Sequence, residues 1–295
     1  MQINWICLNG TYKNRKKDER LNLTFELNYG SNSNNFLPLI IEGTDLKDAY
    51  VYTQKETFSN IIKAVFCEGC KPKMADIPMV EILARQGYAY FWNMEDLLWF
   101  LKLANRLVLN PYDITDLIVE IERSNHSAKV TQLCYQIGEV LGMTEFPWED
   151  VLYHDIGKIA IPQSLLFAPR YYTETEKYFV KTHVLHGSYL IKRLNLDGAK
   201  RLFALYHHEK YDGSGYYKGF SREEIPKPVR VLTVCDVYEA LSSHRSYRTA
   251  LDIEIIGSFM TSKSGIWFDP EIVDALIECT VQKNTQRRGV IKYEN

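Results

Sequence analysis

The sequence YHDIGK at residues 153–158 decides how the rest of this chain can fold. It places His154 beside Asp155 between two apolar runs, 151–152 and 159–161. Polar side chains in apolar surroundings need partners once they leave water. A metal ion would satisfy both, because imidazole nitrogen and carboxylate oxygen are ligands of Zn, Mn and Fe. The stretch therefore predicts a metal site, which other polar residues of the chain would complete.

The composition is typical of a soluble globular protein. The 295 residues are enough for one large domain or two ordinary ones, and 46% of them are apolar. A net charge of -2 offers no basic face to a nucleic acid polymer. The apolar stretch 97–109 contains Lys102 and Arg106, so we expect no membrane span, and residues 1–5 do not resemble a signal peptide. Six scattered cysteines favour a reducing compartment, so we expect a cytoplasmic protein.

Residues 1–110 are predicted to form a separate α+β module. Its function stays open between a structural or dimerising cap, which would make the protein a homodimer, and a sensor domain. Alternation and turn residues predict strands and a loop, and longer periodic stretches predict helices. We expect strands at 21–28, 36–42 and 49–54, a loop at 30–35, and helices at 56–66 and 94–109.

Cys67 and Cys70 form one CxxC pair in this module. A structural zinc site usually needs a second pair, and the chain has none at a suitable spacing. We interpret the two residues as ordinary thiols, with redox sensing kept as an alternative for testing.

Residues 111–284 are predicted to form an all-α domain after the turn at 110–113. Apolar residues recur every three or four positions from 114 to 143, which predicts one long helix or two joined helices. A polar tail follows at 285–295. Further helices are expected at 173–194, 197–209, 228–243, 251–261 and 270–283.

All seven histidines lie in this second region. Glu122 and His126 are four residues apart on a predicted helix and would share a face, although, taken alone, an exposed i,i+4 pair explains that spacing better. His207 and His208 are adjacent, point in different directions on a helix, and can serve different metals. Asp236 lies in an otherwise apolar stretch, where a lone carboxylate needs a partner or a metal.

Taken in their order along the chain, these residues make the region 122–276 resemble the HD-GYP family of HD-superfamily phosphohydrolases. The resemblance implies an HD-type helical fold for this region and hydrolysis of the bacterial second messenger cyclic di-GMP. It rests on four blocks, HDIGKIAIP at 154–162, HHEKYDGSGYYKG at 207–219, VCDVYEALSSHRSYR at 234–248 and FDP at 268–270.

The resemblance also implies a centre of two or three divalent metal ions, iron or manganese. The histidine four residues before Gly187 matches the ligand position, so His183 is expected to bind metal and His186 is not. Asp155 is expected to bridge two ions, and Glu122 to hold a third. The eight implied ligands are Glu122, His126, His154, Asp155, His183, His207, His208 and Asp236.

Three basic residues match phosphate-binding positions of the family: Lys158, Arg245 and Arg248. Asp155 and Lys158 are the expected catalytic residues.

The sequence also departs from the family pattern. The GYP tripeptide reads GYY at 215–217, Ser246 replaces a proline, and residues 168–170 read APR where Lys-Pro-Gly is usual. The GYP loop is associated with partner proteins that carry GGDEF domains, so the lost proline puts that partner in doubt.

The ligand set indicates a mechanism. A metal-bridging hydroxide would attack the phosphodiester and produce pGpG, GMP or both. Two alternatives remain open: the same chemistry on another cyclic dinucleotide or nucleotide, and a signalling module that binds metal and ligand without turnover. A complete set of polar ligands in an apolar domain favours catalysis.

Overall fold

The computed structural model describes residues 2–7, 17–18, 23–26, 38–43, 45–55, 61–196, 198–244 and 249–290. The predicted fold class is confirmed: helices and strands alternate in the N-terminal region, and the later region is helical. The predicted loop at 30–35 lies outside the described residues. No helix among the described residues is both long enough and apolar enough to cross a membrane.

A six-stranded sheet with the order β2-β3-β1-β4-β5-β6 organises the N-terminal region. Neighbouring strands run parallel except for β2 and β3. Parallel neighbours need crossover connections. Helix α1 (Leu46–Lys55) lies between β4 and β5 in the chain, and α2 (Ile77–Arg85) lies between β5 and β6. The strands are β1 (Gln2–Cys7), β2 (Lys17–Asp18), β3 (Leu23–Glu26), β4 (Leu39–Glu42), β5 (Lys63–Phe66) and β6 (Tyr88–Phe91).

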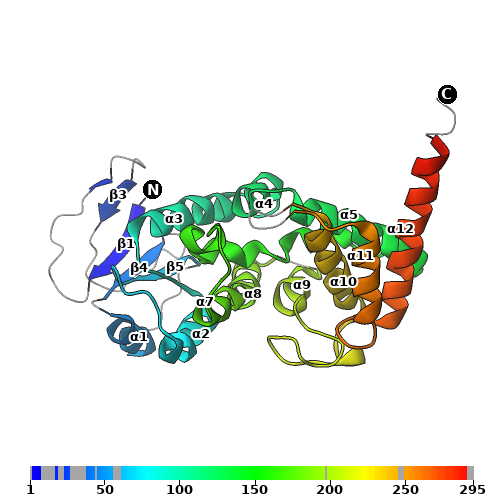
Figure 1. The fold of residues 1–295 in the computed structure, drawn as a ribbon. Coiled ribbons are helices and arrows are strands. Elements are labelled where there is room, and N and C mark those ends of the chain that lie inside the picture. The colour runs from blue at the N-terminus through cyan, green and yellow to red at the C-terminus, as the bar shows by residue number, and fades with distance from the viewer. Residues whose placement is uncertain are drawn as a thin grey trace. The chain divides into compact units, whose positions relative to one another are not determined.

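The central strands β4, β5 and β6 are buried on both faces. Successive side chains of a strand point to opposite faces. Ile41, Val65 and Tyr90 pack in one core with residues of α1 and α2. On the other face Phe91 contacts Phe100 of α3 (Met94–Leu109), with 5.1 Å between ring centroids. Figure 1 shows α1 and α2 on one side of these strands and α3 on the other.

Three sequence predictions for this region are confirmed within the described residues: two strands, and one helix whose bounds agree to the residue. Strands β3 and β4 lie inside the predicted stretches 21–28 and 36–42. Helix α3 occupies the predicted range 94–109, and Asn93 caps it by accepting a hydrogen bond from the Asp96 amide at 2.9 Å.

Two other predictions were wrong. Residues 49–54, predicted as a strand, belong to helix α1, because the buried positions Leu46, Ala49 and Thr53 recur at helical spacing. Residues 56–66, predicted as a helix, contain strand β5, while 56–60 lie outside the described residues. A short apolar run buried on both faces of a parallel sheet has no alternation, so periodicity cannot distinguish it from a buried helix.

The region after residue 110 is built from helices and short 3₁₀ turns. The stretch 114–143 forms two joined helices, and so does 173–194, where Thr182 separates them. The last helix continues to Val290, into the segment 285–295 that was predicted as a polar tail. The α-helices are α4 (Thr115–Glu122), α5 (His126–Val140), α6 (Gln163–Leu166), α7 (Glu174–Lys181), α8 (His183–Arg193), α9 (Lys200–Tyr206), α10 (Lys227–Ser242), α11 (Ile253–Ser262) and α12 (Pro270–Val290).

The chain divides into two compact units, each made of two segments. Unit 1 contains Met1–Ile121 and Asp155–Leu196, and unit 2 contains Glu122–His154 and Asp197–Asn295. One of the points at which the chain passes from one unit to the other therefore lies between His154 and Asp155. The division of the chain into a module at 1–110, a helical domain at 111–284 and a tail at 285–295 remains a prediction.

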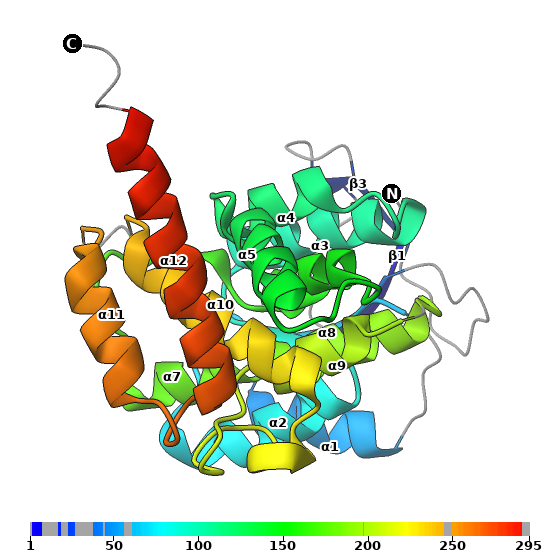
Figure 2. The ribbon, with the colours of Figure 1, turned by 90° about the vertical axis from the view of Figure 1, so that its right-hand side faces the viewer.

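The core of unit 2 is formed by α5, α10 and α12. Buried residues of these helices pack together, among them Ile137, Leu232 and Leu276. Figure 2 shows α12 running alongside α10 and α11. The closing FDP block joins two of these helices, because Asp269 before α12 pairs with Arg230 of α10. Helices α5 and α10 carry several of the polar residues described next.

Candidate metal centre

Four histidines share one hydrogen-bonding pattern. In each of them Nδ1 faces an accepting oxygen, so Nδ1 carries a proton, and in His154, His183 and His207 Nε2 keeps its lone pair. In His126 Nε2 also faces a carboxylate, that of Asp236 at 2.9 Å. Histidine ligands of metals typically have this arrangement. The pairs are His126 with the Glu239 carboxylate, His154 with the Val151 carbonyl at 2.9 Å, His183 with the Val180 carbonyl at 2.7 Å and His207 with the Phe203 carbonyl at 2.8 Å.

Three of the expected ligands meet near the start of α5 in unit 2. Ligand atoms of Glu122, His126 and His154 lie within 4.8 Å of one another. The reason given from the sequence was wrong, because Glu122 and His126 do not share one helix. Helix α4 ends at Glu122, the chain turns at Arg123 with φ 52°, and α5 begins at His126. The turn, rather than an i,i+4 spacing, brings the two residues together.

The carboxylate of Glu122 is held in place by the next helix. It accepts hydrogen bonds from the backbone amide and the hydroxyl of Ser127, at 3.1 and 2.5 Å. A carboxylate at a helix N-terminus also interacts favourably with the helix dipole. Glu122 is therefore a pre-positioned oxygen donor beside His126.

Asp236 reaches the same cluster from α10. Its Oδ1 lies 2.9 Å from Nε2 of His126. Burial alone would raise the pKa of Asp236, but the hydrogen bond from His126 and the nearby His154 and His208 hold it well below the usual aspartate range. Asp236 therefore stays ionised, as a metal ligand must.

Glu239 was missed by the sequence analysis. It lies three residues after Asp236 on α10, on the same helix face, and its buried carboxylate accepts the Nδ1 proton of His126. The i,i+3 spacing of two acidic residues in an apolar helix was the signal that could have identified it. Glu239 orients the imidazole rather than binding metal itself.

Glu239→Gln should weaken metal affinity by about 10- to 100-fold, the usual effect of losing an outer partner of a histidine ligand. The amide keeps the shape of the side chain but loses the charge that stabilises the Nδ1 proton. Calorimetric titration of metal-free protein with Mn²⁺ measures the effect. Glu254→Gln, at an exposed position of α11, is the matched control and should bind Mn²⁺ like the unsubstituted protein. Equal affinities of all three proteins would contradict the role of Glu239.

The double histidine continues the cluster at the end of α9. The ring of His207 lies 5.1 Å from that of His154 and 4.0 Å from that of His208, centroid to centroid. The ring of Tyr216 stacks on His208 at 4.8 Å. Six expected ligands thus come together in unit 2: Glu122, His126, His154, His207, His208 and Asp236.

Glu209 organises the Gly-rich loop that follows the double histidine, a role that the sequence analysis did not anticipate. The buried carboxylate accepts hydrogen bonds from the amides of Lys218 and Gly219, at 2.5 and 3.1 Å. Burial raises its pKa, and these backbone donors partly offset that rise. At Gly215 a Cβ atom would lie 2.4 Å from the Lys210 nitrogen, so the loop closes only with glycine there.

The two remaining expected ligands, Asp155 and His183, lie in unit 1. Nε2 of His183 is 3.5 Å from Oδ1 of Asp155, and both side chains are buried. Lys158 forms an ion pair with Oδ2 of Asp155. Lys158, expected to contact substrate phosphate, therefore also neutralises the carboxylate of the HD pair.

Close packing holds Asp155 and His183 at this separation. Gly157 lies in the 3₁₀ turn η3 (Ile156–Ala160), directly against α8. A Cβ atom at Gly157 would lie 1.9 Å from the His183 carbonyl oxygen and 2.4 Å from the Gly187 nitrogen. The glycines of HDIGK and of the HxxxG pattern thus let two backbones touch.

The other expected substrate-binding groups have different outcomes. Arg245 and Arg248 lie outside the described residues. Arg170, which stands near the usual lysine position, forms a two-pronged pair with the buried Glu176 at 2.7 and 2.8 Å. Lys71 pairs with the same carboxylate at 2.6 Å. In this structure Arg170 is therefore engaged by Glu176 within unit 1.

Neither His186 nor the CxxC pair joins these clusters in the described structure. His186 is buried, and burial lowers its pKa to about 3, so its ring is neutral. Cys67 and Cys70 are thiols that form no disulfide within the described residues. Burial raises the pKa of Cys67 to about 12, which disfavours its thiolate.

Lys63 of β5 is the buried cation of unit 1, and its desolvation gives a pH-dependent prediction. Burial, with a contribution from Arg193, lowers its pKa from 10.5 to about 8. The folded state therefore binds fewer protons than the unfolded state between pH 8 and 10.5, and stability rises with pH in that window. Below pH 8 both states are protonated and the full cost, about 3 kcal/mol, is present.

Lys63→Met should therefore raise the free energy of unfolding by about 3 kcal/mol at pH 7, since it removes a desolvated charge and keeps the apolar stem. The gain should shrink from pH 8 upward and vanish near pH 10.5. Urea unfolding of both proteins at several pH values measures it, and other titrating groups cancel in the difference. A gain that did not change with pH would show that charge is not its cause.

Comparisons with known proteins agree with this architecture. A family model described as HD domain matches residues 116–272. The chain is 38% identical over 173 residues to the cyclic di-GMP phosphodiesterase response regulator RpfG of Xanthomonas campestris pv. campestris (strain 8004), over 55% of this chain and 43% of that protein. It is 32% identical over 206 residues to a cyclic di-GMP phosphodiesterase of Thermotoga maritima, over 67% of this chain and 53% of that protein.

A third relative is named for a different cyclic dinucleotide. The 3'3'-cGAMP-specific phosphodiesterase 2 of Vibrio cholerae is 27% identical over 243 residues, over 79% of this chain and 46% of that protein. The chain spans about half the length of these curated relatives.

The helical fold and its buried histidines and carboxylates define a class of proteins whose side chains could hold divalent metal ions. The chain belongs to the HD domain family, because the family model covers more than half of its residues.

Proposed function

We propose that this protein is a metal-dependent phosphodiesterase that hydrolyses cyclic di-GMP to pGpG, GMP or both. The observation that carries the proposal is the shared orientation of four buried histidines, each of which directs Nδ1 at an accepting oxygen. The relatives named as cyclic di-GMP phosphodiesterases support the choice of substrate.

The donor set fits two or three divalent ions, and we propose iron or manganese. Neutral imidazoles and ionised carboxylates suit these metals, and no thiolate is needed. Bound ions of this kind supply a nucleophile at neutral pH and polarise the phosphate. We propose as ligands Glu122, His126, His154, Asp155, His183, His207, His208 and Asp236, with Asp155 bridging and Glu122 holding a third ion.

The chain's own residues would prepare the substrate for hydrolysis. Lys158, Arg245 and Arg248 would neutralise the phosphates by charge-assisted hydrogen bonds. In the reaction, oxygen from water bonds to phosphorus, the bond from phosphorus to the ribose oxygen breaks, and that oxygen takes a proton. Glu239 and the three backbone carbonyls keep the imidazoles in the tautomer that the reaction requires.

A second candidate is the same reaction on another cyclic dinucleotide. The relative named for 3'3'-cGAMP covers a larger share of this chain than the other two. The departure from GYP to GYY at 215–217 changes the loop beside His208 and supports the same alternative.

Location and partners are also part of the proposal. We propose a cytoplasmic protein, since its substrate is an intracellular messenger. The loop at 207–219 is where a GGDEF-type partner would bind, and its GYY sequence counts against such a partner. The first 110 residues would act as a sensor or a dimerising module. A module that binds metal and ligand without turnover is the remaining alternative.

Anaerobically purified protein should contain two or three metal ions per chain by elemental analysis. Chromatography should then show pGpG or GMP after incubation with cyclic di-GMP. 3'3'-cGAMP and other cyclic dinucleotides are tested in parallel and identify the preferred substrate. Metal-loaded, folded protein that cleaved none of them would overturn the proposed enzyme and favour a binding module.

A further inference from the structure

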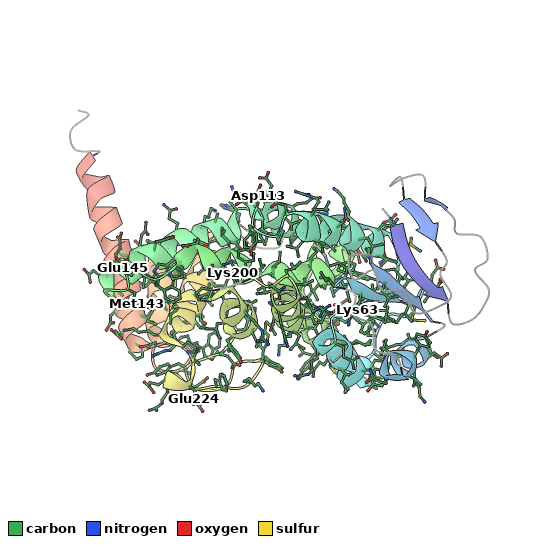
Figure 3. The ribbon with its side chains drawn as sticks, turned by 180° about the vertical axis from the view of Figure 1, so that it is seen from behind. Lys63, Asp113, Met143, Glu145, Lys200 and Glu224 are labelled. Atoms are coloured by element: carbon green, nitrogen blue, oxygen red, sulfur yellow. The ribbon has the colours of Figure 1, made fainter. Side chains whose placement is uncertain are left out.

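Two cysteines at the carboxyl end of β5 have no part in the proposed hydrolysis. Lys63, labelled in Figure 3, begins this strand, and the residues CEGC at 67–70 follow its end. They form a tight turn, in which the amide of Cys70 donates a hydrogen bond to the carbonyl of Cys67 at 3.1 Å and Gly69 has a φ of 73°. Such a turn keeps the Cα atoms of its first and last residues within about 7 Å, and a disulfide spans about 4.4–6.8 Å. The backbone therefore holds the two cysteines at a separation that suits a disulfide.

Contacts with β6 and the residue after it hold this turn in place. The amide of Gly69 donates a hydrogen bond to the Trp92 carbonyl at 2.8 Å. The Tyr90 hydroxyl donates one to the Cys70 carbonyl at 2.6 Å. The side chain of Tyr90 also interacts with both thiols, and the thiols of Cys67 and Cys70 interact with each other. Both sulfur atoms therefore lie near the same hydroxyl group.

The two cysteines differ in their access to solvent. Cys67 is buried, and burial raises its pKa to about 12, so its thiolate is rare at neutral pH. Cys70 is half-buried. A small reagent can therefore reach Cys70, whereas Cys67 can react only with its neighbour in the turn, where proximity offsets the low thiolate fraction. A disulfide carries no charge, so burial does not penalise it as it penalises a thiolate.

We propose that Cys67 and Cys70 are a reversible thiol–disulfide site that exchanges with small disulfides of the glutathione type. The Cys70 thiolate attacks one sulfur of the small disulfide, and a mixed disulfide forms as the first small thiol leaves. The Cys67 sulfur then gives up its proton and attacks the Cys70 sulfur, and the second small thiol leaves. The protein loses two electrons and two protons, and the small disulfide gains them.

The site would give the N-terminal region a chemical input. Lys71 directly follows Cys70, and its amine pairs at 2.6 Å with Glu176 of α7, which is 2% exposed. A change of the backbone at Cys70 would therefore act on this ion pair. Disulfides in a reducing compartment are usually transient and often sense redox conditions, which agrees with a sensor role for residues 1–110. The proposal does not depend on the proposed hydrolysis.

Mass analysis of the full chain after equilibration in glutathione buffers tests the site. The protein is incubated without oxygen at several ratios of oxidised to reduced glutathione, quenched with acid, unfolded, alkylated and cut with trypsin. The fragment 64–73 contains both cysteines of the turn and no other cysteine, because Pro72 protects the bond after Lys71. Under oxidising ratios this fragment should carry no alkyl group and be two hydrogen atoms lighter. Excess reduced glutathione should restore two alkylated thiols.

Two variants identify the role of each cysteine. Cys67→Ser should keep one glutathione on Cys70, because no second thiol can displace it. Cys70→Ser should leave Cys67 without glutathione, since that thiol is buried. Cys134 and Cys235, buried in the core of unit 2, are the controls within the same sample and should remain thiols. Circular dichroism verifies that both variants are folded.

A comparison with unfolded protein shows whether the turn itself prepares the disulfide. The equilibrium constant for closing the ring should be about tenfold higher in the folded protein than in urea, because the turn already holds the cysteines together. Equal constants would overturn the proposal. Folded protein that formed no disulfide in the fragment 64–73 at any glutathione ratio would also overturn it, as would glutathione on Cys67 in the Cys70→Ser variant.

Discussion

Asp236→Ala should lower the rate of cyclic di-GMP hydrolysis by about 10³-fold, because losing a metal ion removes several kcal/mol of transition-state stabilisation. Asp236 contacts Nε2 of His126 at 2.9 Å, and His126, His154 and His208 keep its pKa low. The variant should also contain less than the native amount of metal. Product formation and elemental analysis on the same sample measure both effects.

Asp274→Ala is the matched control for this variant. Asp274 is an exposed carboxylate on α12 of the same unit, and its loss should change neither metal content nor rate. Circular dichroism verifies that both variants are folded. An Asp236→Ala protein with full metal content and full activity would remove Asp236 from the site and would count against the proposed ligand set.

Gly157→Ala should destabilise the protein by on the order of 3 kcal/mol, near the upper end for inserting atoms into a packed interior. The new Cβ would lie 1.9 Å from the His183 carbonyl oxygen, which is a backbone atom and cannot rotate away. The 3₁₀ turn and α8 would have to separate, which would change the 3.5 Å spacing of Asp155 and His183. Urea unfolding measures the stability, and Mn²⁺ titration measures the consequence for the site.

Gly257→Ala should have the opposite effect on stability. Gly257 lies within α11, and nothing lies within 4 Å of a Cβ atom placed there. Alanine is the better helix former, so this variant should gain about 0.5–1 kcal/mol. If both alanine variants changed stability by similar amounts, close packing at Gly157 would not be the reason for its glycine.

The proposed metal centre places one requirement on its surroundings. Each histidine must keep its proton on Nδ1, since a proton on Nε2 would block the lone pair that binds metal. For three of the five proposed histidine ligands, His154, His183 and His207, the chain meets this requirement with backbone carbonyls three or four residues earlier. Glu239 accepts from Nδ1 of His126. The first three partners are supplied by local helical geometry, so they come with the fold and need no dedicated side chain.

Much of this protein was readable from the sequence because the decisive information is local. The HDIGK block and the double histidine are contiguous, and their polar side chains among apolar neighbours predict a metal site without knowledge of the fold. Helix α3 was predicted to the residue, since its apolar period is long and Asn93 caps it. The change from a mixed α and β region before residue 110 to a helical region after it also follows from local patterns.

Other features were decided by contacts between residues far apart in the sequence. Strand β5 is buried on both faces by neighbours that periodicity cannot reveal, and Glu239 acts on a histidine 113 positions away. Glu122 and His126 meet through a turn rather than along one helix. Position 157 needs a glycine because the backbone of α8 leaves no room for a Cβ atom. The amine of Lys63 contacts aromatic rings of β6 and α8 in place of water. The sequence by itself indicated which residues are the candidate ligands, whereas packing in three dimensions decided their partners, tautomers and charges, because these depend on burial and distance.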